Sequence, residues 1–297
     1  MDCQKLDKEF DLLSDAFDKA REKYVLAYQL IANLLAALVL SIVGGIALML
    51  LGKESVVATF FGFIIGVIAL GAAGLVLSAG AGAVHRRVFA PPESSYESPW
   101  EAALKFLRHN CPALSGGYCV AYATLLVVAC ILLVPAGVAN PKLLLGQIIY
   151  ALLLIPMVAV AAVGVFALLV GIFAMPAEVA LREQSATTTI NKFLAGAFRR
   201  TRKCLCPFAI AFVAAVLVAL PIFALLYVAS YFLRTLTLTV AGVEFDNIAS
   251  SLIDFFSCLI IAAAATLPMA YFTVIVGLKY RRATEAEEED IPIDSET

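Results

Sequence analysis

Long apolar stretches that contain at most one charged residue alternate with shorter charged segments along this chain. A transmembrane helix needs about 20 predominantly apolar residues, and six stretches exceed that length. Core helices of a soluble protein would be shorter and would show a polar face. The pattern therefore predicts an all-α integral membrane protein. Its six predicted transmembrane helices, within a membrane domain over 24–282, are 24–51, 56–84, 114–139, 143–175, 207–233 and 252–278.

Three shorter segments have the periodicity of amphipathic helices. Apolar residues step by three and four along 1–23, and similar stripes predict interfacial helices near 99–110 and 187–203. Pro99, which follows Ser98, suits a first helical turn. Each segment precedes a pair of spans, which indicates three repeats of a cytoplasmic amphipathic helix plus a helical hairpin. The alternative is that these segments are ordinary juxtamembrane helices without duplication.

Composition supports the membrane assignment. Hydrophobic residues make up 62% of the chain and charged residues 15%, against roughly 45–50% and 25% in soluble proteins. These values exclude a disulfide-rich secreted domain, a disordered protein and a soluble nucleic-acid-binding protein. Only the acidic tail, 283–297, lacks apolar periodicity, and we expect it to be disordered.

Lysine and arginine residues concentrate on one side of the predicted membrane. That side has 18 of them, in 1–24, 85–110, 176–205 and 279–282. The opposite side has only three, which are Lys53, Lys142 and Arg234. Because positively charged loops stay in the cytoplasm, we predict a multi-pass protein of the plasma (inner) membrane with both termini in the cytoplasm.

Small residues recur at multiples of four positions in the first two spans. Such a face lets two helix backbones approach closely. We predict that these spans pack on each other within the chain, with homo-oligomerisation or docking of a partner as the alternative. The packing candidates are Ala37, Ser41 and Gly45 in the first span and Gly62, Gly66, Gly74, Ser78 and Gly82 in the second.

Residues that could support chemistry are scarce. Asp254 and Glu178 lie near span ends, and His85 and His109 stand beside arginines where a solvated side chain is expected. No metal-ligand spacing, phosphate-binding loop or nucleophile elbow is present. We therefore predict no catalytic residue, cofactor or metal site, and these absences weigh against an enzyme.

The first and third amphipathic segments differ in charge and therefore in expected partner. The first is net acidic, which favours a protein surface over anionic headgroups. We predict that it docks a membrane-protein partner through Leu6, Phe10, Leu13 and Phe17. The third is strongly basic and suits anionic lipids, unless its charges serve only to fix topology. Its candidate lipid-binding residues are Lys192, Arg199, Arg200, Arg202 and Lys203.

The stretch Pro176–Leu220 combines a Pro-Ala-Glu-Val-Ala helix end, a Ser/Thr-rich linker, an amphipathic helix with Phe198-Arg199-Arg200 and a new span. This layout resembles the polytopic membrane domain found beside glycerophosphodiester phosphodiesterases and related uncharacterised prokaryotic six-helix proteins. The segment 98–135 has a similar but less clear layout. No catalytic motif is included, so the resemblance implies an integral membrane protein and no activity.

Two functions agree with these observations. The first is a non-catalytic multi-pass membrane scaffold or accessory subunit of a membrane complex, which explains the near absence of intramembrane charge. The alternative is a transporter or lipid-handling protein for hydrophobic or lipid cargo, with a mostly apolar cavity between kinked helices. The prolines expected to kink spans are Pro135, Pro156, Pro221 and Pro268.

Overall fold

Regular structure in the described part of the chain is entirely helical. Five helices there are long and apolar enough to cross a membrane, and a sixth crossing is formed if one bent helix pair counts as a single span. This confirms the predicted multi-pass helical class, whereas the threefold repeat stays a prediction. The computed structural model describes residues 3–53, 55–89, 98–138, 164–182, 209–228 and 247–289, with a few isolated positions between 152 and 191.

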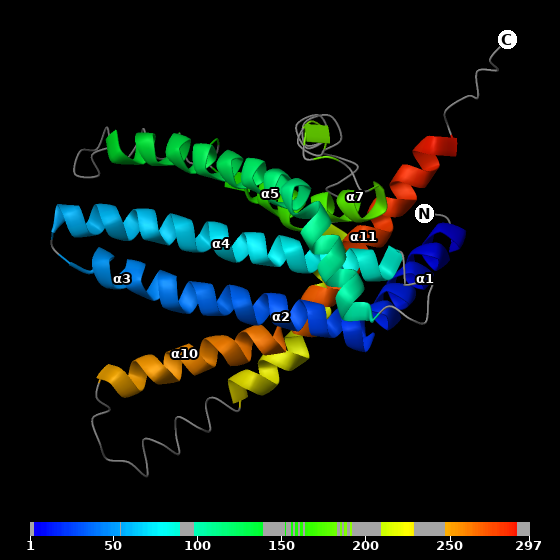
Figure 1. Ribbon diagram of the computed structural model, residues 1–297, viewed down its shortest axis with the longest axis horizontal. Helices are drawn as coiled ribbons and strands as arrows, with labels where there is room; N and C mark the ends of the chain where they lie inside the picture. Colours follow the sequence, from blue (N-terminus) through cyan, green and yellow to red (C-terminus); the bar gives the residue numbers. More distant parts are fainter. Residues whose placement is uncertain are drawn as a thin grey trace.

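The described helices form a bundle with two distinct ends (Figure 1). α1 and the last turns of α11 lie at one end, which we call the terminal end, and the turn between α3 and α4 lies at the other. α4 runs between α5 and the path formed by α2 and α3 (Figure 1). The elements are α1 (Cys3–Ala20), α2 (Lys23–Val39), the π-helical turn η1 (Leu40–Gly44), α3 (Gly45–Leu51), α4 (Val56–Phe89), α5 (Pro99–Val138), the π-helical turn η2 (Val170–Ala174), α7 (Met175–Arg182), α10 (Asn247–Ala264) and α11 (Thr266–Glu289).

Helix α5 begins where the sequence predicts a helix start. The Glu101 N–H donates to the Ser98 hydroxyl at 3.2 Å, and the Ser98 N–H donates to the Glu101 carboxylate at 3.4 Å, which makes a capping box. The predicted interfacial segment 99–110 and the span 114–139 differ from expectation, because they belong to one continuous helix. Its first turns cross the terminal end before the helix bends to lie along α4 (Figure 1). Pro112 lacks an N–H, which bends a helix without ending it.

The sixth predicted span consists of two helices. α10 and α11 meet at Ala265 with a bend of 44°. Pro268 lies in the first turn of α11, in agreement with the kink predicted there. α11 then continues through Glu289, so residues 283–289 of the tail expected to be disordered are helical, whereas 290–297 lie outside the described residues. Alanine and glutamate are strong helix formers, and extending an existing helix needs no new nucleus.

Glycines allow α4 to approach helices on two sides. A Cβ added at Gly62 would lie 2.9 Å from a carbonyl oxygen of α3, and one at Gly80 would lie 2.3 Å from the Ala32 Cβ of α2. On the other side, a Cβ at Gly74 would lie 2.1 Å from the Tyr118 hydroxyl of α5. At Gly62 and Gly80 the obstructing atoms are backbone atoms or an alanine Cβ, so glycine sets the spacing of α4 from α3 and α2. At Gly74 the obstructing atoms are the end of the Tyr118 side chain, which would have to move.

The other small residues of the second span also face different neighbours. Gly66 faces α3 and Gly82 faces α5. The Ser78 hydroxyl donates to a carbonyl oxygen of η2 at 3.5 Å. The row predicted to pack on the first span is therefore shared among three helices, because successive positions four apart turn around the helix by about 40°.

The small residues of the first span do not form a straight row. Ala37 is buried and Ser41 is half-buried, but a Cβ at Gly45 would meet no atom within 4 Å. The packing role predicted for Gly45 is therefore corrected. The four-residue spacing drifts around the helix, and η1 changes the register once more before Gly45. Ala47 takes the buried position facing α4 instead.

Candidate functional site

Helix α1 is fixed against α11 by its apolar face. The Tyr271 hydroxyl donates to the Leu13 carbonyl at 3.2 Å, and its ring meets the Phe17 ring edge-on with centroids 5.5 Å apart. Lys279 pairs with Glu9 beside these contacts. The N-terminal helix is therefore held to α11 by both apolar and charged contacts. Among the side chains that the structure describes on α1, Leu12, Ala16 and Ala20 are fully buried.

The opposite face of α1 is acidic and exposed. Asp11, Asp15 and Asp18 are all exposed on this face. Phe10 stands beside them with 64% of its surface exposed. The Lys19 ammonium lies 3.1 Å from the Asp15 carboxylate, and the two residues form an exposed ion pair one helical turn apart. We call Phe10, Asp11, Asp15 and Asp18 the acidic face.

The docking stripe predicted from the sequence is divided between these two faces. Leu13 and Phe17 lie against α11, whereas Phe10 is exposed. The side chain of Leu6 lies outside the described residues. The docking of a partner stays a prediction. Among the described residues of the stripe, Phe10 is exposed enough to contact a partner.

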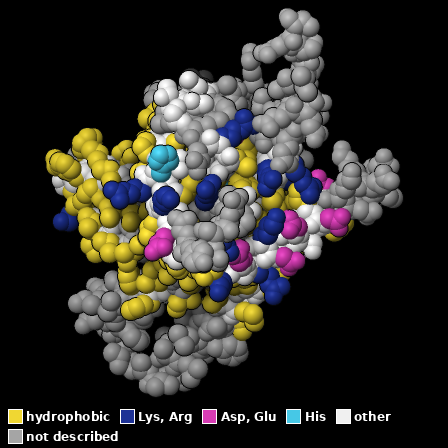
Figure 2. Space-filling model, turned by 45° about the vertical axis from the view of Figure 1, so that its right-hand side comes forward, with side chains coloured by type: hydrophobic (Ala, Val, Ile, Leu, Met, Phe, Trp, Pro, Cys, Tyr) yellow, Lys and Arg dark blue, Asp and Glu magenta, His cyan; other side chains and the backbone are white. Residues whose placement is uncertain are grey.

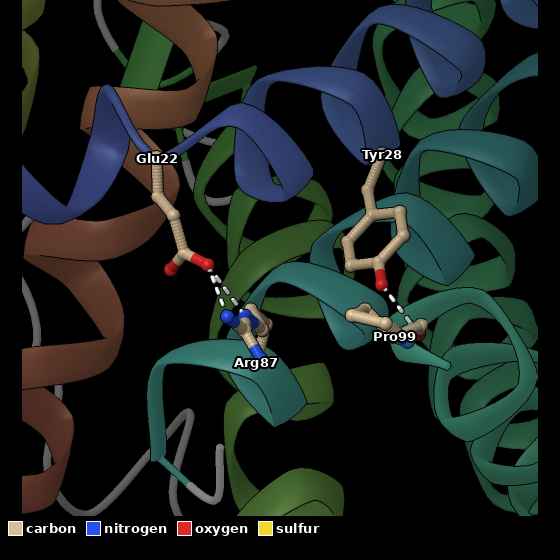
Figure 3. A network of polar contacts seen from close by, with 4 residues as sticks. All are labelled: Glu22, Tyr28, Arg87 and Pro99. Carbon is tan, nitrogen blue, oxygen red and sulfur yellow. Dashed lines mark hydrogen bonds and ion pairs between the residues drawn. The ribbon is translucent and has the colours of Figure 1, made fainter. Parts of the chain in front are cut away.

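An ion pair joins the α1–α2 turn to α4, and a tyrosine hydroxyl joins α2 to α5 (Figure 3). The Arg87 Nε donates to the Glu22 carboxylate at 2.7 Å. The Arg87 guanidinium also lies over the Tyr24 ring, 5.4 Å from its centroid. The Tyr28 hydroxyl donates to the Pro99 carbonyl at 2.6 Å, at the first residue of α5. Segments far apart in the sequence are thus connected at the terminal end.

We expect Arg87→Gln to lower the free energy of unfolding by about 1–2 kcal/mol, because it removes a half-buried ion pair and a cation–π contact. Unfolding of the full chain in detergent measures the change. The charge-swapped variant, Glu22→Arg with Arg87→Glu, should recover part of the loss. A swapped variant that is no more stable than the sum of its two single variants would contradict this assignment.

His85 is buried at the end of α4, so the solvated position predicted for it is wrong. Its Nε2 lies 2.9 Å from the Phe173 carbonyl oxygen, and its ring stacks on Phe89 with centroids 5.5 Å apart. Its Nδ1 has no hydrogen-bond partner in the described part of the chain. The imidazole is covered by η2 and α11, which are distant in the sequence. The charged residues next to His85 in the sequence therefore could not indicate that it is buried.

Glu178 is buried in α7 and bonded to neighbouring side chains. The Tyr280 hydroxyl of α11 donates to its carboxylate, and the Arg182 Nε lies 3.7 Å from it. This arrangement joins α7 to α11. The side chain of Asp254 lies outside the described residues. Within the described ranges, no three His, Cys, Asp or Glu side chains gather as metal ligands.

A polar cluster lies between α2 and the bend of α10 and α11. The Gln29 Nε2 donates to Asn33 Oδ1 at 2.9 Å, and the Asn33 Nδ2 donates to the Ala262 carbonyl at 3.2 Å. The Thr273 hydroxyl lies 3.4 Å from Gln29 Oε1. Thr266 also reaches the Ala262 carbonyl, at 3.4 Å. An unpaired carbonyl is costly in a membrane, so the cluster stabilises the bend.

The lipid-binding residues predicted from the basic run cannot be placed. They lie outside the described residues: Lys192, Arg199, Arg200, Arg202 and Lys203. A different group of cations, on α5, was not predicted as a site. Leu104, Lys105, Arg108 and His109 line an open cavity of about 550 Å³. Their i, i+1, i+4, i+5 spacing places them on one helix face.

No family model matches this chain, and no curated protein or solved structure matches it either. The resemblance to the membrane domain beside glycerophosphodiester phosphodiesterases is therefore untested. Functional inference depends on the surfaces and contacts described above.

Proposed function

We propose that the protein is a non-catalytic multi-pass membrane scaffold or accessory subunit, and that the acidic face of α1 docks a basic segment of a partner protein. The observation that supports this most is the combination of a fixed helix and an exposed face. α1 is tied to α11 through Phe17, Leu13 and Glu9, yet it presents Phe10 among three exposed aspartates. A preordered surface of this kind binds without a large ordering cost.

Charge selects the kind of partner. The exposed carboxylates of Asp11, Asp15 and Asp18 repel the anionic headgroups of a cytoplasmic leaflet. Lysine and arginine side chains of a protein complement them, and such complementarity sets association rate and specificity. Phe10 supplies an aromatic anchor of the type that dominates binding energy at interfaces. We place this face in the cytoplasm, on the basis of the positive-inside distribution.

The alternative function has less support among the described residues. A transporter binding site is expected at a broken span, and α10 and α11 form such a bend. The polar side chains there, Gln29, Asn33 and Thr273, are buried and bond to one another and to a helix carbonyl. The resemblance to the phosphodiesterase-associated membrane domain agrees with a non-catalytic membrane role and adds no substrate.

Photocrosslinking from position 10 tests the proposal. With p-benzoylphenylalanine in place of Phe10, we expect a crosslink to a Lys/Arg-rich segment of a membrane protein in native membranes. Reversing the acidic face with Asp11→Lys, Asp15→Lys and Asp18→Lys should reduce the crosslink at least about tenfold, since several charge pairs contribute together. Reversal of the partner's basic residues to glutamate should restore it.

A matched control lies on the same helix. Lys19→Glu adds negative charge beside Asp15 and should keep or strengthen the crosslink. Thermal unfolding in detergent shows whether each variant keeps its fold. A crosslink that survives the triple reversal, or one that reaches only lipid or a second copy of this chain, would overturn the proposal.

A further inference from the structure

The first turns of α5 have two faces of different character. Ala103, Phe106, Asn110 and Ala113 are buried against the bundle. The Asn110 side chain donates to the Phe106 carbonyl at 3.1 Å, which stabilises the buried side. On the outer side, the four residues that line the cavity of about 550 Å³ are all exposed, and they comprise two cations, a histidine and a leucine. We call Leu104, Lys105, Arg108 and His109 the α5 basic site.

The α5 basic site precedes a part of the helix that is long enough to cross a membrane. α5 continues from Asn110 to Val138, and at 1.5 Å per residue this part is roughly 40 Å long. That length exceeds the roughly 30 Å of a bilayer core. We therefore place the site next to the headgroups of the leaflet at the terminal end. Figure 2 shows Lys and Arg side chains and a histidine gathered at this end, beside a flank covered with hydrophobic side chains.

Apolar side chains adjoin the cations on the same stretch of helix. Leu104 is 65% exposed and Trp100, one turn earlier, is 40% exposed. The indole is held by an edge-on contact with Tyr28, with centroids 5.0 Å apart. Tryptophan favours the membrane–water interface. Free phosphate needs only the cations, whereas a phospholipid also uses the apolar neighbours.

We propose that the α5 basic site binds the phosphate group of an anionic phospholipid. Arg108 and Lys105 pair with the phosphate oxygens, and His109 donates a hydrogen bond to them. Leu104 and Trp100 contact the glycerol backbone and the first methylenes of the acyl chains. Arg86 of α4, whose guanidinium lies 5.9 Å from the Phe106 ring centroid, adds positive charge behind this face. The proposal does not depend on the acidic face or on a protein partner.

The chain contains its own reporter, because Trp100 is its only tryptophan. Bromine quenches indole fluorescence only at short range, so lipids brominated near the headgroup end of their chains report which lipid is adjacent. The full-length protein is reconstituted in phosphatidylcholine vesicles that contain about 20 mol% phosphatidylglycerol. In one sample the phosphatidylglycerol is brominated, and in a second sample the phosphatidylcholine is brominated. The two quenching curves give the relative affinity for anionic over zwitterionic lipid at this position.

We expect clear enrichment of phosphatidylglycerol beside Trp100. The double variant Lys105→Gln with Arg108→Gln should reduce that relative affinity by about fivefold for each cation removed. The matched control, Lys19→Gln with Arg21→Gln, removes the same charge from the terminal end and should leave it unchanged. Circular dichroism and Trp100 emission in detergent show whether the fold around the reporter is kept.

Other results would overturn the proposal. Equal quenching by the two brominated lipids means no anionic site, and equal enrichment in the double variant and the control means that general surface charge attracts the lipid. If millimolar inorganic phosphate abolishes the enrichment, while equal ionic strength of chloride does not, the site takes free phosphate instead of a lipid. Enrichment that needs Lys105 and Arg108 and resists inorganic phosphate supports the assignment.

Discussion

We expect Gly80→Leu to destabilise the protein by about 3 kcal/mol or more, because it forces side-chain atoms into the tightest contact between α2 and α4. A Cβ at Gly80 would lie 2.3 Å from the Ala32 Cβ, whereas non-bonded carbon atoms need roughly 3.5–4.0 Å. The Ala32 Cβ is rigidly attached to its backbone and cannot turn away. The helices must therefore separate, and overpacking of this kind costs about 1–3 kcal/mol or occasionally more.

Gly45→Leu is the matched control, because it places the same side chain in the same hairpin. A Cβ at Gly45 meets no atom within 4 Å, and its φ of −60° suits any L-residue. We expect a change within about 0.5 kcal/mol, or a slight gain from the better helix propensity of leucine. Unfolding of both full-length variants in mixed micelles gives the comparison. Equal stability of the two variants would show that α2 and α4 do not meet at Gly80.

The sequence predicts the small-residue face of α4 and only some of its partners. Gly62 and Gly66 do face α3, which lies within the predicted first span, whereas Gly74 and Gly82 face α5. A glycine pattern reports that something must come close, and it cannot report which helix does so. Gly74 faces Tyr118 of α5, and Gly80, which was not among the predicted residues, faces Ala32. The start of α5 at Pro99 was predictable, because a cap is encoded within four residues. Contacts between helices far apart in the chain have no such local code.

The same distinction explains the candidate sites. The acidity of α1 was visible in the sequence, but its attachment to Tyr271 depends on a helix more than 250 residues away. Lys105 and Arg108 were counted for topology, which depends on charge number alone. Their role as a site depends on which helix face stays open, and that is decided by the burial of Phe106 and Asn110 on the other side. His85 shows the reverse case, in which a side chain between charged neighbours becomes part of the core.

α11 contacts several other helices through its polar side chains. It holds α1 through Tyr271, reaches Gln29 of α2 through Thr273 and bonds Glu178 of α7 through Tyr280. Its residues from Ala270 to Leu278 are all buried. Polar side chains supply much of this contact, as expected where apolar helix faces gain little by leaving lipid. Disturbance of α11 should therefore propagate to several helices, and at Gly277 an added Cβ would meet the buried His85 side chain.

We expect Gly277→Ala and His85→Ala to be strongly non-additive. A Cβ at Gly277 would lie 2.5 Å from His85 Nδ1 and 2.9 Å from the Phe89 ring, so Gly277→Ala alone should cost about 1–3 kcal/mol. His85→Ala alone should cost about 2–3 kcal/mol, because it leaves a cavity and removes the hydrogen bond to the Phe173 carbonyl. In the double variant the alanine methyl occupies vacated space, and Phe89 loses the ring against which it stacks.

The double variant should be more stable than the sum of the single losses by at least about 1 kcal/mol, in a cycle measured by unfolding in mixed micelles. Gly44→Ala provides the matched control for the glycine change, since its Cβ meets no atom within 4 Å. Combined with His85→Ala, it should give additive losses. Additivity in the Gly277 cycle as well would mean that α4 and α11 do not meet through the imidazole. Strong coupling would establish His85 as the side chain that sets the distance between these helices, which explains a buried histidine without a catalytic role.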